Sequence, residues 1–116
     1  MTHPRAPSSA LETIQTKLAN GALDEAGALI DELLVDFASD PNLAYLSALR
    51  YRLTSNAAKA LQTLSDLTAR FPDMARAYQE IAVNCLSINL PQKALEAAEK
   101  AVALYDLLPT RPPVLG

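Results

Sequence analysis

The sequence predicts an all-α protein built from three antiparallel helical hairpins, and three observations support this fold class. Alanine and leucine, both strong helix formers, account for 21 and 20 of the 116 residues, whereas valine and isoleucine number four each and glycine three. Short turn segments recur at a constant spacing along the chain. The apolar residues around each turn follow the i, i+3, i+4, i+7 spacing of an amphipathic helix.

The repeated turn segments lie at residues 21–26, 55–60 and 89–94. They open with Gly21, Ser55 and Asn89, residue types that suit a tight turn or left-handed backbone. Each segment leads into an amphipathic run, so each turn is expected to join two helices. Equal spacing between the three turns indicates an internal repeat. The alanines that close the segments keep the same period: Ala26, Ala60 and Ala94.

The first hairpin is predicted to pair a helix over 9–20 with a helix over 22–38. Ser9 and Glu12 have the spacing of a capping box, in which each side chain satisfies an exposed amide of the other residue. Leu11, Ile14 and Leu18 then share one face of the first helix. In the second helix, the inward positions are Ala26, Ile30 and Leu33.

The second hairpin is predicted to pair helices over 42–54 and 57–70. Its start is marked by Asp40, a favoured N-cap residue, followed by Pro41 at the first helical position. The connecting loop is short, which forces the two helices to pack side by side. The inward positions are Ala44, Ala48 and Tyr51 before the turn and Ala60, Leu64 and Leu67 after it.

The third hairpin is predicted to pair helices over 74–88 and 91–107, and Pro72-Asp73 marks its start. Apolar residues recur at helical spacing on both sides of the turn. Before the turn they are Tyr78, Ile81, Ala82, Cys85 and Ile88. After the turn they are Ala94, Leu95, Ala98, Ala101, Val102 and Tyr105.

A helix-turn-helix unit of about 34 residues with these positions resembles the tetratricopeptide repeat (TPR) family. In the third unit the resemblance is carried by Tyr78, Ile81, Ala82, Cys85, Ala94, Ala98 and Ala101. In the second unit it is carried by Ala48, Tyr51, Ala60, Leu64, Leu67 and Pro72, and in the first by Ala26, Ile30 and Leu33. The resemblance covers residues 8–108 and implies three stacked hairpins that form a short right-handed superhelical solenoid.

In this family the first helix of each unit lines a concave groove that binds partner proteins. Carried onto the second and third units, the groove positions are Asn42, Tyr45, Leu49, Arg52, Arg76, Gln79, Val83 and Leu86. Tyrosine and arginine are favoured anchors in binding sites. The resemblance therefore implies a non-catalytic scaffold that binds a peptide segment or a partner subunit, with Arg52 or Arg76 meeting an acidic group.

Charge and hydropathy exclude several classes of function. The formal net charge is −3 and no basic block is present, which argues against a nucleic-acid partner. No stretch of about 20 apolar residues runs without charges, so no membrane span is expected. The N-terminal residues lack the apolar core of a signal peptide, and Cys85 is the single cysteine. These features predict a cytoplasmic protein.

The residues that could carry chemistry are few. His3 is the single histidine and lies in a proline-rich leader. Cys85 falls at an inward helical position, where a buried structural thiol is the expected state. The sequence offers neither a glycine-rich phosphate loop nor a pair of cysteine or histidine ligands, so no catalytic residue, cofactor or metal is predicted.

The expected organisation is a leader over 1–8, repeats over about 9–40, 41–72 and 73–108, and a proline-rich tail over 109–116. The last helix carries an apolar face that no seventh helix covers: Ala98, Ala101, Val102, Tyr105 and Leu108. Three explanations remain open: the tail folds back, two chains pair as a homodimer, or a further domain packs there. In the last case the chain is an accessory N-terminal region of a longer bacterial enzyme, of sulfotransferase or glycosyltransferase type, by analogy of layout.

Overall fold

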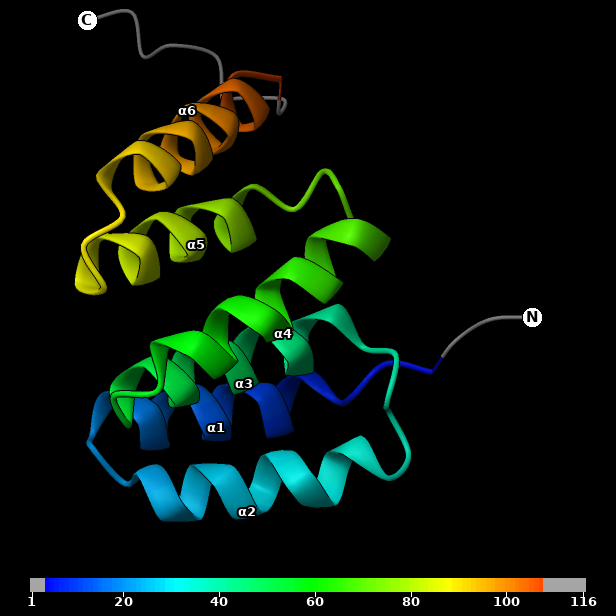
Figure 1. Ribbon diagram of the computed structural model, residues 1–116. Coiled ribbons are helices and arrows are strands. Elements are labelled where there is room, and N and C mark those ends of the chain that lie inside the picture. Colours follow the sequence, from blue (N-terminus) through cyan, green and yellow to red (C-terminus); the bar gives the residue numbers. More distant parts are fainter. Residues whose placement is uncertain (1–3, 108–116) are drawn as a thin grey trace, which may run out of the picture.

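The computed structural model describes residues 4–107, and this part of the chain folds into six α-helices without a strand (Figure 1). The all-α prediction is therefore confirmed. His3, Leu108 and the tail over 109–116 lie outside the described residues. The helices are α1 (Ser8–Ala19), α2 (Leu23–Leu34), α3 (Pro41–Leu53), α4 (Ala57–Arg70), α5 (Ala75–Ser87) and α6 (Pro91–Leu107).

The three turns within the hairpins have the same backbone geometry. Gly21, Ser55 and Asn89 adopt positive φ angles of 78°, 63° and 62°. After each of them the next N–H reaches back five residues to a helix carbonyl, which is the Schellman arrangement. These hydrogen bonds join Ala22 to Lys17 (2.9 Å), Asn56 to Tyr51 (2.8 Å) and Leu90 to Cys85 (2.8 Å). The period of the sequence repeat is thus also a period of backbone conformation.

The start of α3 confirms one expected cap, and the start of α1 corrects another. The carboxylate of Asp40 accepts the N–H of Asn42 at 2.8 Å, and Pro41 occupies the first helical position. Helix α1 begins at Ser8 after Pro7, and no side chain caps it. The capping box of Ser9 with Glu12 is therefore wrong, because the earlier start places Ser9 inside the first turn, where its carbonyl accepts the hydroxyl of Thr13.

The residues before α1 join the fold. Ala6 is buried, and its N–H donates to the Asp40 carboxylate at 2.6 Å. Arg5 lies over the ring of Phe71, with its guanidinium carbon 5.8 Å from the ring centre. Part of the expected leader over 1–8 thus contacts the start of α3 and the end of α4.

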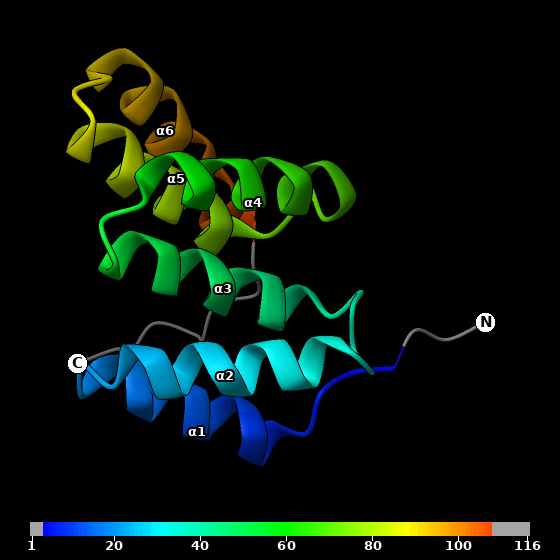
Figure 2. The same ribbon diagram turned by 60° about the horizontal axis from the view of Figure 1, so that its bottom comes forward.

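The helices pack in chain order. Each helix contacts the next one, and in addition α1 contacts α3 and α3 contacts α5. Among the described residues α2 and α4 stay apart, as do α4 and α6. Figures 1 and 2 show this order as a progression from α1 and α2 at one end of the molecule to α5 and α6 at the other. Helices α1, α3 and α5 therefore form one continuous layer.

The core consists of two buried clusters, both contacted by Tyr45, and it thins out towards α6. One buried cluster joins α1, α2 and α3, and a second joins α3, α4 and α5. Helix α6 buries only small residues, namely Ala94, Ala97 and Ala101. Small side chains allow α6 to approach α5 closely. None of the six helices is both long and apolar enough to cross a membrane.

The outer face of α6 is exposed. Leu95 and Val102 are 56% and 59% exposed, and Tyr105 is also exposed. The expectation of an uncovered face thus holds for Val102 and Tyr105. It is wrong for Ala101, which is buried, because the helix turns its alanine stripe inward and leaves the larger residues outside.

Candidate binding groove

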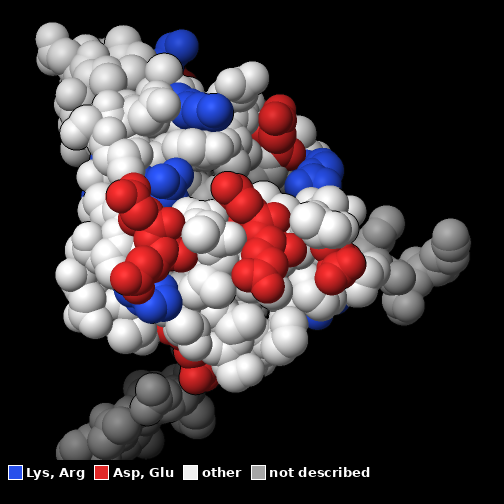
Figure 3. Space-filling view, turned by 90° about the horizontal axis from the view of Figure 1, so that it is seen from below, with Lys and Arg blue, Asp and Glu red and all other residues white. Residues whose placement is uncertain are grey.

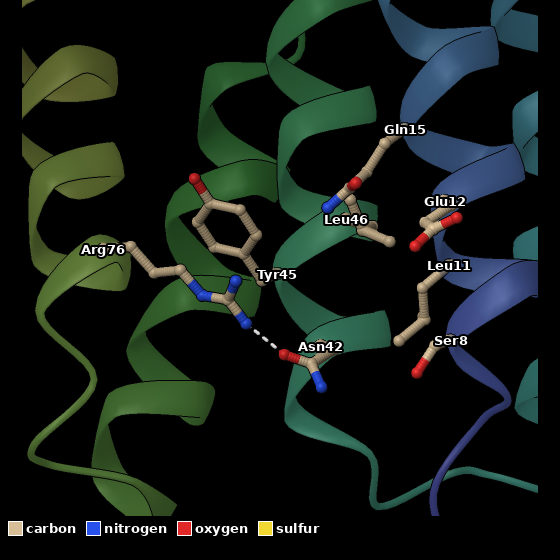
Figure 4. A pocket seen from close by; sticks show the side chains of 8 residues that line it. All are labelled: Ser8, Leu11, Glu12, Gln15, Asn42, Tyr45, Leu46 and Arg76. Atoms are coloured by element: carbon tan, nitrogen blue, oxygen red, sulfur yellow. Dashed lines mark hydrogen bonds between the residues drawn. The ribbon is translucent and has the colours of Figure 1, made fainter.

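The layer of α1, α3 and α5 contains a hollow of about 220 Å³ (Figure 4). Helix α1 supplies one wall, α3 the floor and α5 a single side chain. A second hollow, of about 400 Å³, adjoins it because Asn42 and Arg76 line both. We call the two hollows together the groove. The first is lined by Ser8, Leu11, Glu12, Gln15, Asn42, Tyr45, Leu46 and Arg76.

Arg76 crosses from α5 to α3. Its guanidinium lies over the ring of Tyr45, 4.7 Å from the ring centre, and donates to Oδ1 of Asn42. Figure 4 shows the guanidinium between these two side chains, facing the wall formed by α1. A cation in this position is attracted by the negative face of the aromatic ring. Within residues 4–107 Arg76 forms no ion pair, so its charge is not neutralised by a carboxylate.

Arg52, in contrast, is paired. Its Nε donates to the carboxylate of Glu80, which is only 6% exposed. The amide of the buried Asn84 donates to the Glu80 carbonyl at 2.8 Å, whereas its own Oδ1 has no hydrogen-bond partner among the described residues. The Arg52–Glu80 pair therefore links α3 to α5 as part of the fold. Of the two arginines expected to meet an acidic group, Arg76 is the one that has no carboxylate partner within residues 4–107.

Tyr45 is half-buried under this arrangement. Burial raises the pKa of its phenol above the ordinary value of 10.0, and the nearby Glu80 carboxylate raises the pKa further. Arg76 acts in the opposite direction. The phenol therefore stays protonated at neutral pH and retains a hydroxyl that can donate a hydrogen bond.

Further arginines surround the second hollow. Arg70 lines it, and its guanidinium carbon lies 5.7 Å from the centre of the Phe71 ring. Arg5 lies over the same ring. Asp73 is the acidic residue that lines this hollow. The end of the groove nearest the start of α5 is therefore basic, although the whole chain carries a net negative charge.

The other end of the groove face is apolar. Leu49 is half-buried on α3, whereas Val83 and Leu86 are 40% and 63% exposed on α5. Between the two ends, Gln79 accepts a hydrogen bond from the hydroxyl of Tyr105 at 3.1 Å. Of the eight positions expected from the sequence, three line the first hollow, and the others lie along the same two helices: Leu49, Arg52, Gln79, Val83 and Leu86.

The α1 wall was not among the expected positions. Ser8, Leu11 and Gln15 lie one repeat length before Asn42, Tyr45 and Leu49 respectively. The sequence repeat therefore could have predicted these three residues as groove positions of the first unit. The repeat does not predict Glu12 as a groove residue, because the equivalent positions in the other two units, Leu46 and Glu80, are buried.

The end of the molecule formed by α1 and α2, opposite the end formed by α5 and α6, carries the acidic residues of α2. Seen from below, this face shows several groups of acidic side chains (Figure 3). Asp24, Glu25, Asp31 and Glu32 lie on α2 and are exposed. Across residues 4–107 there is no group of three or more histidine, cysteine or acidic side chains that could hold a metal ion.

Comparison of the chain with protein-family models, with curated proteins and with solved structures finds no match.

Proposed function

We propose that this protein is a TPR-like interaction scaffold whose groove binds an extended peptide segment of a partner protein. The regular period of the turn geometry and the continuous layer of α1, α3 and α5 support a short solenoid of three units. In such an architecture the layer of first helices provides the binding surface. We further propose that the protein acts in the cytoplasm, where its single, buried thiol stays reduced.

The observation that carries the proposal is the state of Arg76. Its guanidinium is held in place by Tyr45 and Asn42 but lacks a carboxylate partner among the described residues. Guanidinium groups pair with carboxylates through two parallel hydrogen bonds, and preorganisation reduces the entropy lost on binding. The proposed ligand therefore places an aspartate, a glutamate or a terminal carboxylate at Arg76.

The far end of the groove defines the remainder of the ligand. Val83 and Leu86 follow Arg76 on α5 by two and three helical turns, at a rise of about 1.5 Å per residue. An apolar side chain about 10 to 15 Å from the acidic group would cover them. The proposed ligand is thus an amphipathic segment with an acidic residue at one end and an apolar residue at the other.

Selection from a displayed library of random peptides tests this proposal. We expect enriched peptides to share an acidic residue and an apolar one, in either order along the peptide, and Arg76→Gln to weaken their binding about tenfold by fluorescence anisotropy. Lys59→Gln is the matched control, because Lys59 also lies over a tyrosine ring, 5.3 Å from the Tyr51 centre, but on α4. Equal losses for the two variants, or enrichment without an acidic residue, would overturn the proposal.

The exposed face of α6 supports a second candidate. Leu95 and Val102 form an apolar stripe on which nothing packs within residues 4–107. A second copy of the chain, or a catalytic domain of a longer bacterial enzyme of sulfotransferase or glycosyltransferase type, would cover it. Sedimentation of the 116-residue chain over a wide concentration range tests the first alternative. A dimer that dissociates after Leu95→Gln and Val102→Gln supports it, and a monomer at all concentrations excludes it.

A further inference from the structure

A separate cavity, distinct from both hollows of the groove, lies on the side of α5 that faces away from the groove. No Cα atom of α4 comes within 8 Å of one in α6, and α5 forms the floor between them. The cavity measures about 460 Å³, a volume typical of small-molecule sites. Ile81, Cys85 and Leu90 give it an apolar floor, whereas Lys93 and Lys100 lie on its α6 wall.

The repeat explains why this space is empty. Cys85 and Lys93 in the third hairpin lie one repeat length after Tyr51 and Lys59 in the second. In the second hairpin the lysine lies over the tyrosine ring, with its Nζ 5.3 Å from the ring centre. In the third hairpin the equivalent lysine lines a cavity, and the tyrosine position holds a cysteine, whose side chain is far smaller than a phenol ring.

The charges at the rim favour an anion. Two lysines line the cavity against one carboxylate, that of Glu96. Within residues 4–107 neither lysine forms an ion pair, but Lys100 lies over the ring of Tyr78, 5.9 Å from its centre. Lys93 is exposed, so its ammonium group can be reached from solvent. Lys100 is exposed too, but Lys93 has neither a ring contact nor an ion pair among the described residues, so a carboxylate can pair with it without displacing another contact.

We propose that this cavity binds a small carboxylate with an apolar body, such as a medium-chain fatty acid. The apolar body occupies the space that the Tyr51 ring fills in the second hairpin, over Ile81 and Cys85. The carboxylate pairs with the ammonium of Lys93. Because Tyr78, Ile81 and Cys85 face away from Arg76 across α5, this site is independent of the groove.

Calorimetric titration with decanoate below its micellar concentration tests the proposal, with decanol as a neutral probe of the same length. We expect saturable binding of one decanoate per chain and clearly weaker binding of decanol. Lys93→Gln is expected to weaken decanoate about fivefold, whereas its repeat equivalent Lys59→Gln leaves the affinity unchanged. Cys85→Tyr, which restores the ring of the second hairpin, is expected to abolish binding.

A second measurement uses the thiol itself and avoids any variant that fails to fold. Cys85 is buried in the cavity floor and is the single thiol of the chain. Bound decanoate is expected to slow its reaction with N-ethylmaleimide at a saturable concentration, and decanol to slow it less. An unchanged labelling rate together with absent calorimetric binding would overturn the proposal, and equal effects of the two probes would overturn the assignment of a carboxylate.

Discussion

Replacement of Asp40 by alanine removes two hydrogen bonds at the point where the chain before α1 meets the start of α3. Asp40 is fully buried, with 0% of its surface exposed. One carboxylate oxygen accepts the N–H of Asn42 at 2.8 Å and caps α3, and the other accepts the N–H of Ala6 at 2.6 Å. The two bonds therefore tie the start of the first hairpin to the start of the second.

The cost of Asp40→Ala follows from these two acceptors. Loss of an N-cap costs about 1 kcal/mol. The N–H of Ala6, left buried without an acceptor, costs about 1 to 3 kcal/mol more. We therefore expect the free energy of unfolding to fall by about 3 kcal/mol, a large fraction of the roughly 5 to 15 kcal/mol that stabilises a typical domain. The midpoint of thermal unfolding is expected to fall by about 15 °C.

Urea denaturation followed by far-ultraviolet circular dichroism measures this change. Asp73→Ala is the matched control, because Asp73 is exposed and precedes α5, whose N-terminus has no side-chain cap. Asp40→Asn retains one oxygen acceptor, so we expect a loss between those of the other two variants. If Asp40→Ala destabilises the protein no more than Asp73→Ala, the inferred role of the buried carboxylate is wrong.

Three further predictions concern backbone strain, packing and pH. Ser55 adopts a φ of 63°, so Ser55→Gly is expected to stabilise the fold by about 1 kcal/mol in the same urea assay; a loss of stability would contradict this. A Cβ on Gly27 would clash with the Arg50 guanidinium, whose Nε donates to the Leu23 carbonyl at 2.9 Å. We therefore expect Gly27→Ala to gain about 1 kcal/mol of helix propensity only in an Arg50→Ala background, and a gain of the same size in the wild-type background would refute the clash. Burial raises the pKa of Tyr45 above 10.0, so the unfolded state loses this proton first and stability is expected to fall as the pH rises above about 10. Tyr45→Phe is expected to remove that part of the pH dependence in urea titrations, and an unchanged slope would contradict it.

The fold was largely predictable because its signals are local. The positive-φ turns at Gly21, Ser55 and Asn89 and the cap at Asp40 are properties of a few adjacent residues, and all four are confirmed. The largest error in helix bounds is the end of the second helix, expected at 38 and found at Leu34. There the chain must turn towards α3, and the N–H of Asp40 bonds the carbonyl of Phe37 within this turn.

Three residues of the first hollow were expected from the sequence, whereas the pairing of its charges was not. The family resemblance implied groove positions at Asn42, Tyr45 and Arg76, and these three residues line one hollow. The pairing of Arg52 with Glu80 depends on how α3 and α5 are rotated against each other, which no sequence spacing specifies. The same limit applies to α6, where periodicity alone does not decide which stripe of apolar residues turns inward.

The two proposed sites can be tested separately because the two side chains to be substituted, Arg76 and Lys93, take no part in the hydrogen bonds of the turns and caps. Arg76 contacts Tyr45 and Asn42 through its guanidinium, and Lys93 is an exposed residue of α6 that lines the cavity. Arg76 lies on the side of α5 that lines the groove, whereas Lys93 lines the cavity between α4 and α6. A substitution at either position is therefore expected to leave the helices intact. Loss of peptide binding in Arg76→Gln with decanoate binding retained, and the converse in Lys93→Gln, would establish two independent surfaces on one repeat frame.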